Sequence, residues 1–261
     1  VAVRRQRQMC IRDSISSDQP LRYLNDKNQD EQILEDLACS IPKLLLTNKI
    51  RKQIDNLPNS FFSHDLSKYS EEELRLLNVQ FSFLAHAYVW GDLVPSKILC
   101  KAIAKPWSNI SNMLGRPPIL SYASYCLDNW YKVNQKEPIS LDNVALINNF
   151  LGGVDEDWFV TIHVCIEDAS SDAIDAAYKL SRLNESNNVD DFNTNLKKIL
   201  TSLKNVNNIF SKMPEKCDPY IYYHRVRPYI FGTKDNPDLK KGLIYENCLL
   251  YTSDAADEQQ R

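Results

Sequence analysis

The sequence predicts an all-α protein, and three observations support this prediction. In several segments, apolar residues recur at steps of three and four, as they do along one face of a helix. Ser, Asp and Glu stand just ahead of these segments, where they cap helix N-termini. Nowhere do apolar and polar residues alternate for long enough to indicate a substantial β-strand.

The first half of the chain contains one long predicted helix among shorter ones. A helical pattern runs from Leu44 to Leu57. Ser70 and Glu73 then form a capping box ahead of a longer apolar stripe. The stripe contains Leu74, Leu77, Phe81, Leu84 and Tyr88. Between residues 91 and 118, four prolines and Gly115 predict loops around short helices.

The second half is predicted to begin a new helical domain. The glycine pair at 152–153 is interpreted as the boundary between a small N-terminal domain, 15–152, and the first part of a larger one, 153–247. An apolar helix is expected from Trp158, and another from Ala173 to Leu183 behind a Ser-Ser-Asp cap. A last stripe ends before a proline and contains Phe192, Leu196, Ile199, Leu203, Val206 and Phe210.

Composition narrows the class of protein. Of 261 residues, 43% are apolar and 25% are charged, with a formal net charge of −3, as in an ordinary globular protein. No apolar run is long enough to cross a bilayer, and the slightly acidic balance gives no general attraction to nucleic acid or anionic membranes. We therefore expect a cytoplasmic protein without nucleic-acid or membrane partners.

The two ends are expected to be foreign to the natural protein. A back-translation of Arg4–Asp13 has a reverse complement that encodes Cys248–Asp257, so one oligonucleotide read on opposite strands accounts for both. Because this oligonucleotide resembles a transposase sequencing adapter, residues 1–14 and 248–261 are interpreted as adapter scars. The natural segment is then an N-terminal fragment of a longer protein.

The residues that could carry chemistry are few. The five cysteines outside the ends are widely spaced, and the four histidines form no H-x-x-x-H or H-E-x-x-H pair, so no disulfide framework or self-contained metal site is indicated. His163 stands on an apolar helix face, where it is either a core residue or part of a site. Arg227 lies among aromatic residues, where it is either a clamp for a ligand carboxylate or half of a structural ion pair.

Five motifs, taken together and in order, resemble the indoleamine 2,3-dioxygenase family. The resemblance covers essentially the whole natural segment. The motifs are Ala87-Tyr-Val-Trp-Gly91, Arg116-Pro-Pro-Ile-Leu-Ser-Tyr122-Ala with Leu127-Asp-Asn-Trp130, Phe159 to Glu167, Tyr222-Tyr-His-Arg-Val-Arg227-Pro-Tyr-Ile-Phe-Gly232, and Asn236-Pro with Gly242-Leu-Ile-Tyr-Glu246.

The resemblance implies an activity and a set of site residues. The family consists of haem b enzymes that insert both atoms of O₂ across the indole C2–C3 bond of L-tryptophan, giving N-formylkynurenine. By this resemblance Arg227 would bind the substrate carboxylate, a task suited to a guanidinium fork. Phe159 and Tyr222 would pack on the indole ring. Tyr122 and Cys126 would line the inner pocket, unless they only pack the core.

By the same resemblance, His163 falls where the animal enzyme of this family has a serine and where tryptophan 2,3-dioxygenases have a distal histidine, and it would be the catalytic residue. Its imidazole would accept a hydrogen bond from the indole N–H and so orient the ring over iron-bound O₂. The family's proximal histidine would follow Glu246, where the adapter begins, so no metal ligand is assigned here. We therefore expect a haem dioxygenase, monomeric as is common in the family, of which this fragment is an inactive part.

Two alternatives stay open. The first is a relative that keeps the fold and binds haem, O₂ or tryptophan without turnover. The second is a non-catalytic helical interaction domain, which would have no closed pocket between the segments of Tyr122 and Phe159.

Overall fold

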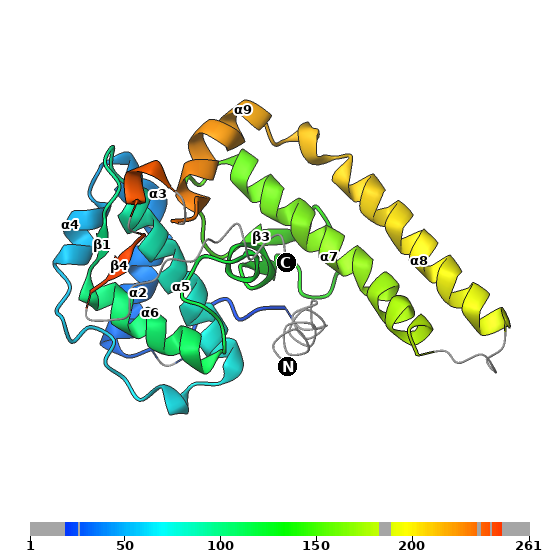
Figure 1. Cartoon of the computed structure of the whole chain (residues 1–261), viewed down its shortest axis with the longest axis horizontal. Coiled ribbons are helices and arrows are strands. Elements are labelled where there is room, and N and C mark those ends of the chain that lie inside the picture. The colour runs from blue at the N-terminus through cyan, green and yellow to red at the C-terminus, as the bar shows by residue number, and fades with distance from the viewer. Residues whose placement is uncertain (1–18, 26, 183–188, 234–235, 241, 247–261) are drawn as a thin grey trace.

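The computed structural model describes residues 19–25, 27–182, 189–233, 236–240 and 242–246. The expected adapter segments, 1–14 and 248–261, lie outside these residues. Helices dominate the described chain, and its strands are only two or three residues long (Figure 1). The predicted all-α class is confirmed.

Four helices of the first half pack around a fifth, central helix. The central helix α5 is surrounded by the others, and most of its residues are buried. The helices are α2 (Gln29–Cys39), α3 (Ile41–Leu46), α4 (Ile50–Asp55), α5 (Glu71–Trp90) and α6 (Lys101–Met113). The predicted capping box of α5 is present, since Ser70 Oγ accepts from the Glu73 N–H at 3.2 Å and the Glu73 carboxylate accepts from the Ser70 N–H at 2.8 Å.

Three details of this half differ from the sequence-based expectation. The pattern from Leu44 to Leu57 forms two short helices, because Asn48 has a φ of 52° that a right-handed helix cannot contain. Helix α6 continues through Pro106, which the sequence had placed among loops. Helix α2 was not predicted, although Asn28 and Glu31 form a capping box at its start.

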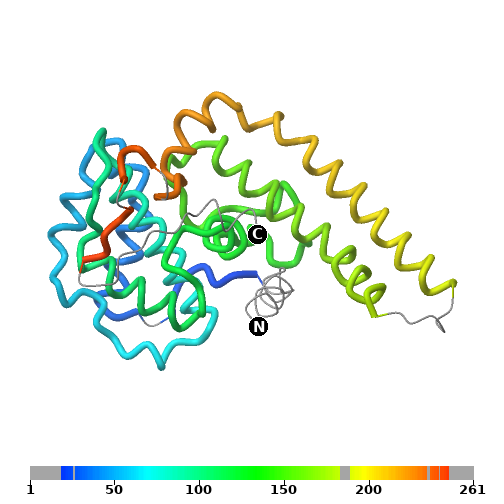
Figure 2. The backbone as a smooth tube through the Cα atoms, viewed as in Figure 1, coloured from blue at the N-terminus to red at the C-terminus, as the bar shows by residue number. Residues whose placement is uncertain are grey.

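The second half forms a long helical hairpin. Helix α7 (Val154–Leu180) and helix α8 (Val189–Phe210) run antiparallel and project from the rest of the chain (Figure 2). The expected new helix at Ala173 is wrong, because α7 is continuous. Ser170 Oγ donates to the Glu167 carbonyl at 2.9 Å instead of capping, and no glycine or proline interrupts α7.

Short elements connect these helices and return the chain to its first half. Strands β2 (Trp130–Lys132) and β3 (Val144–Leu146) pair antiparallel, and β1 (Ile98–Leu99) pairs in parallel with β4 (Ile244–Tyr245). The Glu246 carboxylate accepts from the Lys101 N–H at 2.9 Å, at the start of α6. The short helical segments are η1 (Leu66–Lys68), η2 (Ala123–Leu127), η3 (Met213–Glu215), α9 (Pro219–Ile221), η4 (Tyr222–Val226), η5 (Arg227–Ile230) and η6 (Pro237–Leu239). The division into domains at 152/153 stays a prediction.

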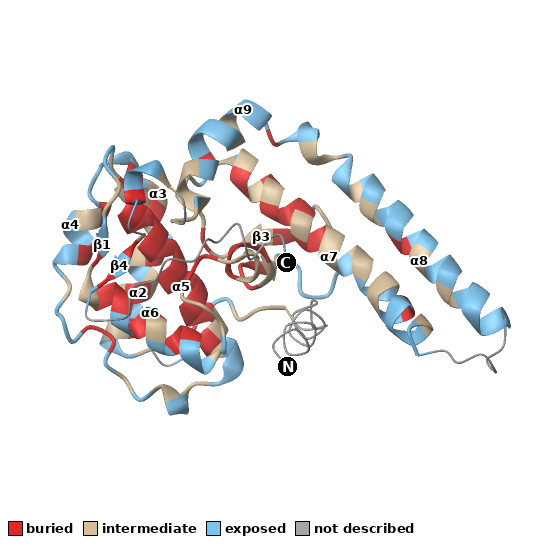
Figure 3. Cartoon of the chain, viewed as in Figure 1, coloured by how far each residue is buried: buried red, intermediate tan, exposed pale blue. Residues whose placement is uncertain are grey.

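The buried core follows α5 and reaches into the base of the hairpin (Figure 3). A buried amide joins three of its elements. Asn78 on α5 donates to Ser124 Oγ of η2 at 3.0 Å and accepts from Trp107 Nε1 and Ser111 Oγ of α6 at 3.1 and 3.0 Å. These buried polar groups hydrogen-bond to one another, and the bonds determine how α6 and η2 are oriented on α5. No described helix is long and apolar enough to cross a membrane.

Candidate active site

Five of the six predicted site residues meet where α7, η2 and η4 pack together. The Phe159 ring centroid lies 4.1 Å from that of Tyr222, nearly parallel to it, and 4.2 Å from that of His163. The Tyr122 ring meets His163 edge-on at 5.9 Å. Cys126 is completely buried one turn beyond Tyr122 on η2. We call these five residues the aromatic cluster.

The sequence explains why these side chains converge. Phe159 and His163 are four residues apart on α7, so they share one face of that helix. Tyr122 and Cys126 have the same spacing, and they approach this face from η2. Tyr222 begins η4, which follows the end of the hairpin and returns the chain to the base of α7. The contacts therefore join three segments that are distant in sequence.

The protonation state of His163 follows from its hydrogen bond. Its Nδ1 lies 2.7 Å from the Phe159 carbonyl oxygen. A carbonyl can only accept, so Nδ1 carries the proton and Nε2 is left as an acceptor. Burial lowers the pKa of His163 below its ordinary value, and the ring is therefore neutral at pH 7. The site thus contains a neutral imidazole with one acceptor nitrogen.

Tyr122 is fixed by a residue outside the predicted set. Its hydroxyl donates to Glu167 Oε1 at 2.9 Å. Burial raises the pKa of Tyr122 well above its usual range, so the phenol stays protonated. Glu167 lies eight residues beyond Phe159 on α7, and this spacing places both residues on the same helix face. The spacing could have identified Glu167 from the sequence.

Two further residues support the cluster and were not predicted. The buried Tyr125 ring lies 6.5 Å from the ring of Phe159. Glu156 is completely buried and accepts from the N–H of Phe150, at 2.9 Å to one oxygen and 3.0 Å to the other, and from that of Leu151 at 2.8 Å. Burial raises the pKa of Glu156 to about 7. Nothing in the sequence pattern distinguishes these residues from ordinary core and cap residues.

Arg227 is the predicted site residue that the structure does not bring into the aromatic cluster. It is exposed at the start of η5, and its guanidinium carbon lies 5.4 Å from the Tyr223 ring centroid. Within the described part of the chain, Arg227 forms no ion pair or hydrogen bond. The structural ion pair that the sequence left open is therefore not formed with any described residue.

The other histidines are engaged elsewhere or lie at the surface. His86 is buried, with Nδ1 2.8 Å from the Tyr229 carbonyl and Nε2 3.4 Å from the Leu120 N–H. His64 lies 3.2 Å from Asp30, and His224 is exposed. In residues 19–246, apart from the undescribed gaps, no three His, Cys, Asp or Glu side chains are arranged to hold a metal ion.

The fold is α-helical, and the aromatic cluster packs where α7, η2 and η4 meet. The family model of Indoleamine 2,3-dioxygenase matches residues 14–260. The chain belongs to this family, and the resemblance noted in the sequence is confirmed.

Similar proteins come from animals and fungi. The chain is 33% identical to a rat indoleamine 2,3-dioxygenase 1 over 80% of its own length and 51% of the relative. It is 30% identical to a Saccharomyces cerevisiae indoleamine 2,3-dioxygenase, over 82% and 48% of the two chains. It is 26% identical to a 6-hydroxytryptophan 2,3-dioxygenase of Fusarium equiseti, over 87% and 55%. The chain spans about half the length of the curated relatives it matches.

Proposed function

We propose that this protein acts as a haem-dependent dioxygenase that inserts both atoms of O₂ across the indole C2–C3 bond of L-tryptophan and releases N-formylkynurenine. The observation that carries the proposal is the neutral His163, whose Nε2 is left as an acceptor within the aromatic cluster. Family membership supports the same reaction. An indole N–H is a donor without acceptor capacity, so it matches this nitrogen.

The residues of the cluster have distinct roles in this proposal. The indole stacks on Phe159 and donates its N–H to His163 Nε2, which fixes the orientation of the ring. Tyr122, held by Glu167, forms the inner wall beside Cys126. Because the Tyr222 ring stacks on Phe159 at 4.1 Å, substrate must displace it. Tyr222 lies on the short segment η4, which can shift with less disruption than the long helix α7.

Arg227 is proposed to bind the substrate carboxylate. Its exposed guanidinium has no ionic partner among the described residues, so it is available for a bidentate contact with a carboxylate. Arg227 lies five residues beyond Tyr222. The proposed displacement of Tyr222 would therefore also move Arg227.

Haem b is the proposed cofactor, and it would supply the iron that activates O₂. The described residues fit one side of such a group, because they offer an apolar aromatic surface with a single uncharged imidazole. They do not offer a histidine that would hold the iron, since both nitrogens of His86 are engaged and His64 and His224 lie apart from the cluster. We propose that the histidine that would hold the iron comes from outside the described residues and that the described part alone is inactive.

The test compares turnover with haem content in the protein expressed at the full length of its relatives. We expect His163→Ala to lower N-formylkynurenine formation by at least about tenfold while the haem absorbance per protein is kept, because one orienting hydrogen bond is lost. His64→Ala, which removes a histidine outside the cluster, is the control and should keep both. Equal loss of activity and haem in His163→Ala would contradict the assigned role.

The same assay separates the alternatives. A relative that binds haem or tryptophan without turnover would show the haem absorbance but no product. A helical interaction domain would show neither.

A further inference from the structure

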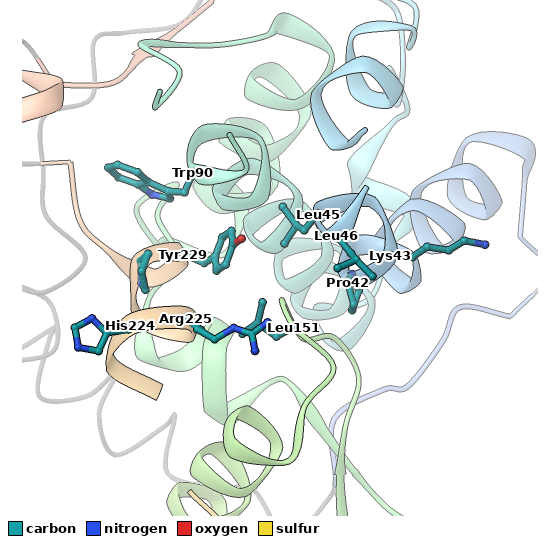
Figure 4. A pocket seen from close by; sticks show the side chains of 10 residues that line it. Pro42, Lys43, Leu45, Leu46, Trp90, Leu151, His224, Arg225 and Tyr229 are labelled. Atoms are coloured by element: carbon teal, nitrogen blue, oxygen red, sulfur yellow. The ribbon is translucent and has the colours of Figure 1, made fainter. Parts of the chain in front are cut away.

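A second site is indicated by a pocket that none of the aromatic cluster residues lines. The pocket has a volume of about 510 Å³ and lies between α3, the end of α5 and the η4–η5 segment (Figure 4). Two stacked rings separate it from the cluster, since Tyr229 stacks on Phe150 at 5.3 Å and Phe150 on Tyr125 at 6.5 Å. Its volume falls within the range of small-molecule sites, roughly 300–1,000 Å³.

The walls of the pocket are mostly apolar and flat. Trp90 and Tyr229 contribute aromatic faces, and Leu45 and Leu151 contribute aliphatic ones. At the rim, the Leu46 side chain is 84% exposed. An exposed leucine beside an apolar pocket leaves surface that a ligand with an apolar body would cover.

The charged side chains that are described in the pocket are basic. Arg225 and Lys43 line it together with His224, and no described Asp or Glu does, although the chain as a whole carries a net charge of −3. Arg225 makes no ion pair or hydrogen bond within the described residues. Figure 4 shows its side chain beside Leu151, whereas Lys43 extends away from the other lining side chains. Arg225 is therefore the cation best placed for a bound anion.

A buried acid that bonds the backbone of Leu151 does not pair with Arg225. The carboxylate of Glu156 accepts from the backbone N–H groups of Phe150 and Leu151 instead. Burial raises the pKa of Glu156 to about 7, so it carries only part of a negative charge at neutral pH.

One wall of the pocket is held in place without a ligand. The buried His86 hydrogen-bonds the Tyr229 carbonyl at 2.8 Å, and the Tyr229 ring lies nearly parallel to Phe150, at an angle of 13°. A wall fixed in this way loses little conformational freedom when a ligand binds.

From these observations we propose that this pocket binds a small aromatic carboxylate, with the carboxylate on Arg225 and the ring against Trp90 and Tyr229. Charge and shape both support this class of ligand, since the described charges in the pocket are positive and Trp90 and Tyr229 contribute aromatic walls. The proposal does not depend on the dioxygenase reaction, because the cluster residues do not line the pocket.

The experiment titrates the chain with indole-3-acetate by isothermal calorimetry. We expect binding to weaken at least about tenfold in Arg225→Gln, because a guanidinium–carboxylate pair is lost. Arg182→Gln, an exposed arginine on the hairpin, is the matched control and should bind like the parent chain. Tryptamine, which carries an amine in place of the carboxylate, should bind at least about tenfold more weakly to the parent chain.

Three outcomes would overturn the proposal. The first is no binding of indole-3-acetate by the parent chain. The second is equal affinity in the parent chain and Arg225→Gln. The third is loss of binding in Phe159→Ala with circular dichroism unchanged, which would place the ligand in the aromatic cluster instead. Failure of the proposed dioxygenase reaction would leave all three measurements unaffected, so the two proposals are tested separately.

Discussion

Individual buried groups make the stability of this chain depend on pH. His86 is fully enclosed, and burial lowers its pKa from 6.5 to about 4. The unfolded chain binds a proton at this histidine below pH 6.5, whereas the folded chain does so only near pH 4. The contribution of His86 to stability is therefore complete above pH 6.5 and is lost as the pH falls towards 4.

Replacing His86 should flatten this dependence. A shift of this size corresponds to about 3 kcal/mol. We expect the free energy of unfolding of the parent chain to rise between pH 4 and 6.5 by about this amount more than that of His86→Gln. Urea unfolding at several pH values measures the difference. Parallel profiles for the two chains would show that His86 is not the group responsible.

At the same scale, the sequence predicted some of the site and not the rest. The four-residue spacing of Phe159 and His163 was sufficient to place both on one helix face. Tyr125 and Glu156 were missed because burial in the core is determined by segments distant in sequence. Arg227 was expected among the aromatic rings. Its position depends on the direction in which η5 continues from η4, and no local sequence pattern specifies that direction.

At the scale of elements, the end of α5 is closely packed. A Cβ added to Gly91 would lie 2.3 Å from the Ala87 carbonyl oxygen and 2.9 Å from Leu45 Cδ2. We expect Gly91→Ala to lower the free energy of unfolding by about 1–3 kcal/mol, because backbone and core atoms must shift. Urea unfolding measures the change.

A matched control exists at the start of α7. Gly153 has a negative φ of −108°, and a Cβ added there would meet no atom within 4 Å. Gly153→Ala should therefore lower stability only by what alanine loses against glycine at an N-cap, about 0.5–1 kcal/mol. Similar losses in the two variants would show that steric crowding is not the reason for glycine at residue 91.

Element boundaries were harder to predict than the elements themselves. The capping box of α5 was recognised because the Ser and Glu side chains act locally. The Ser-Ser-Asp sequence ahead of Ala173 resembles a cap, but Ser170 bonds back within α7. Packing against α8 along its length stabilises α7 as one helix, and this long-range contact was not visible in the local pattern.

At the scale of the whole molecule, the hairpin presents apolar surface on α8. Along the predicted stripe, Ile199 and Val206 are partly buried and the other four residues are exposed. The exposed apolar residues of α8 are Val189, Phe192, Leu196, Leu200, Leu203 and Phe210. We expect this surface to promote self-association of the chain.

Substitution on this surface tests that expectation. The double variant Leu196→Gln with Leu203→Gln should bind less of an apolar fluorescent dye and sediment with less aggregate, while its free energy of unfolding changes by less than about 1 kcal/mol. Lys197→Gln on the same helix is the control and should leave dye binding unchanged. A marked loss of stability in the double variant would mean that these leucines already pack against the chain.

The pairing of β1 with β4 has a consequence for synthesis of the protein. The hydrogen bond from the Lys101 N–H to Glu246 spans 145 residues, and it supplies an acceptor at the start of α6. While the ribosome is still synthesising the hairpin, β1 therefore has no partner strand and the start of α6 lacks the Glu246 acceptor. Contacts of such long sequence separation form late and slowly. Folding of the N-terminal region is thus completed only after residue 246 has left the ribosome, although its helices are made first.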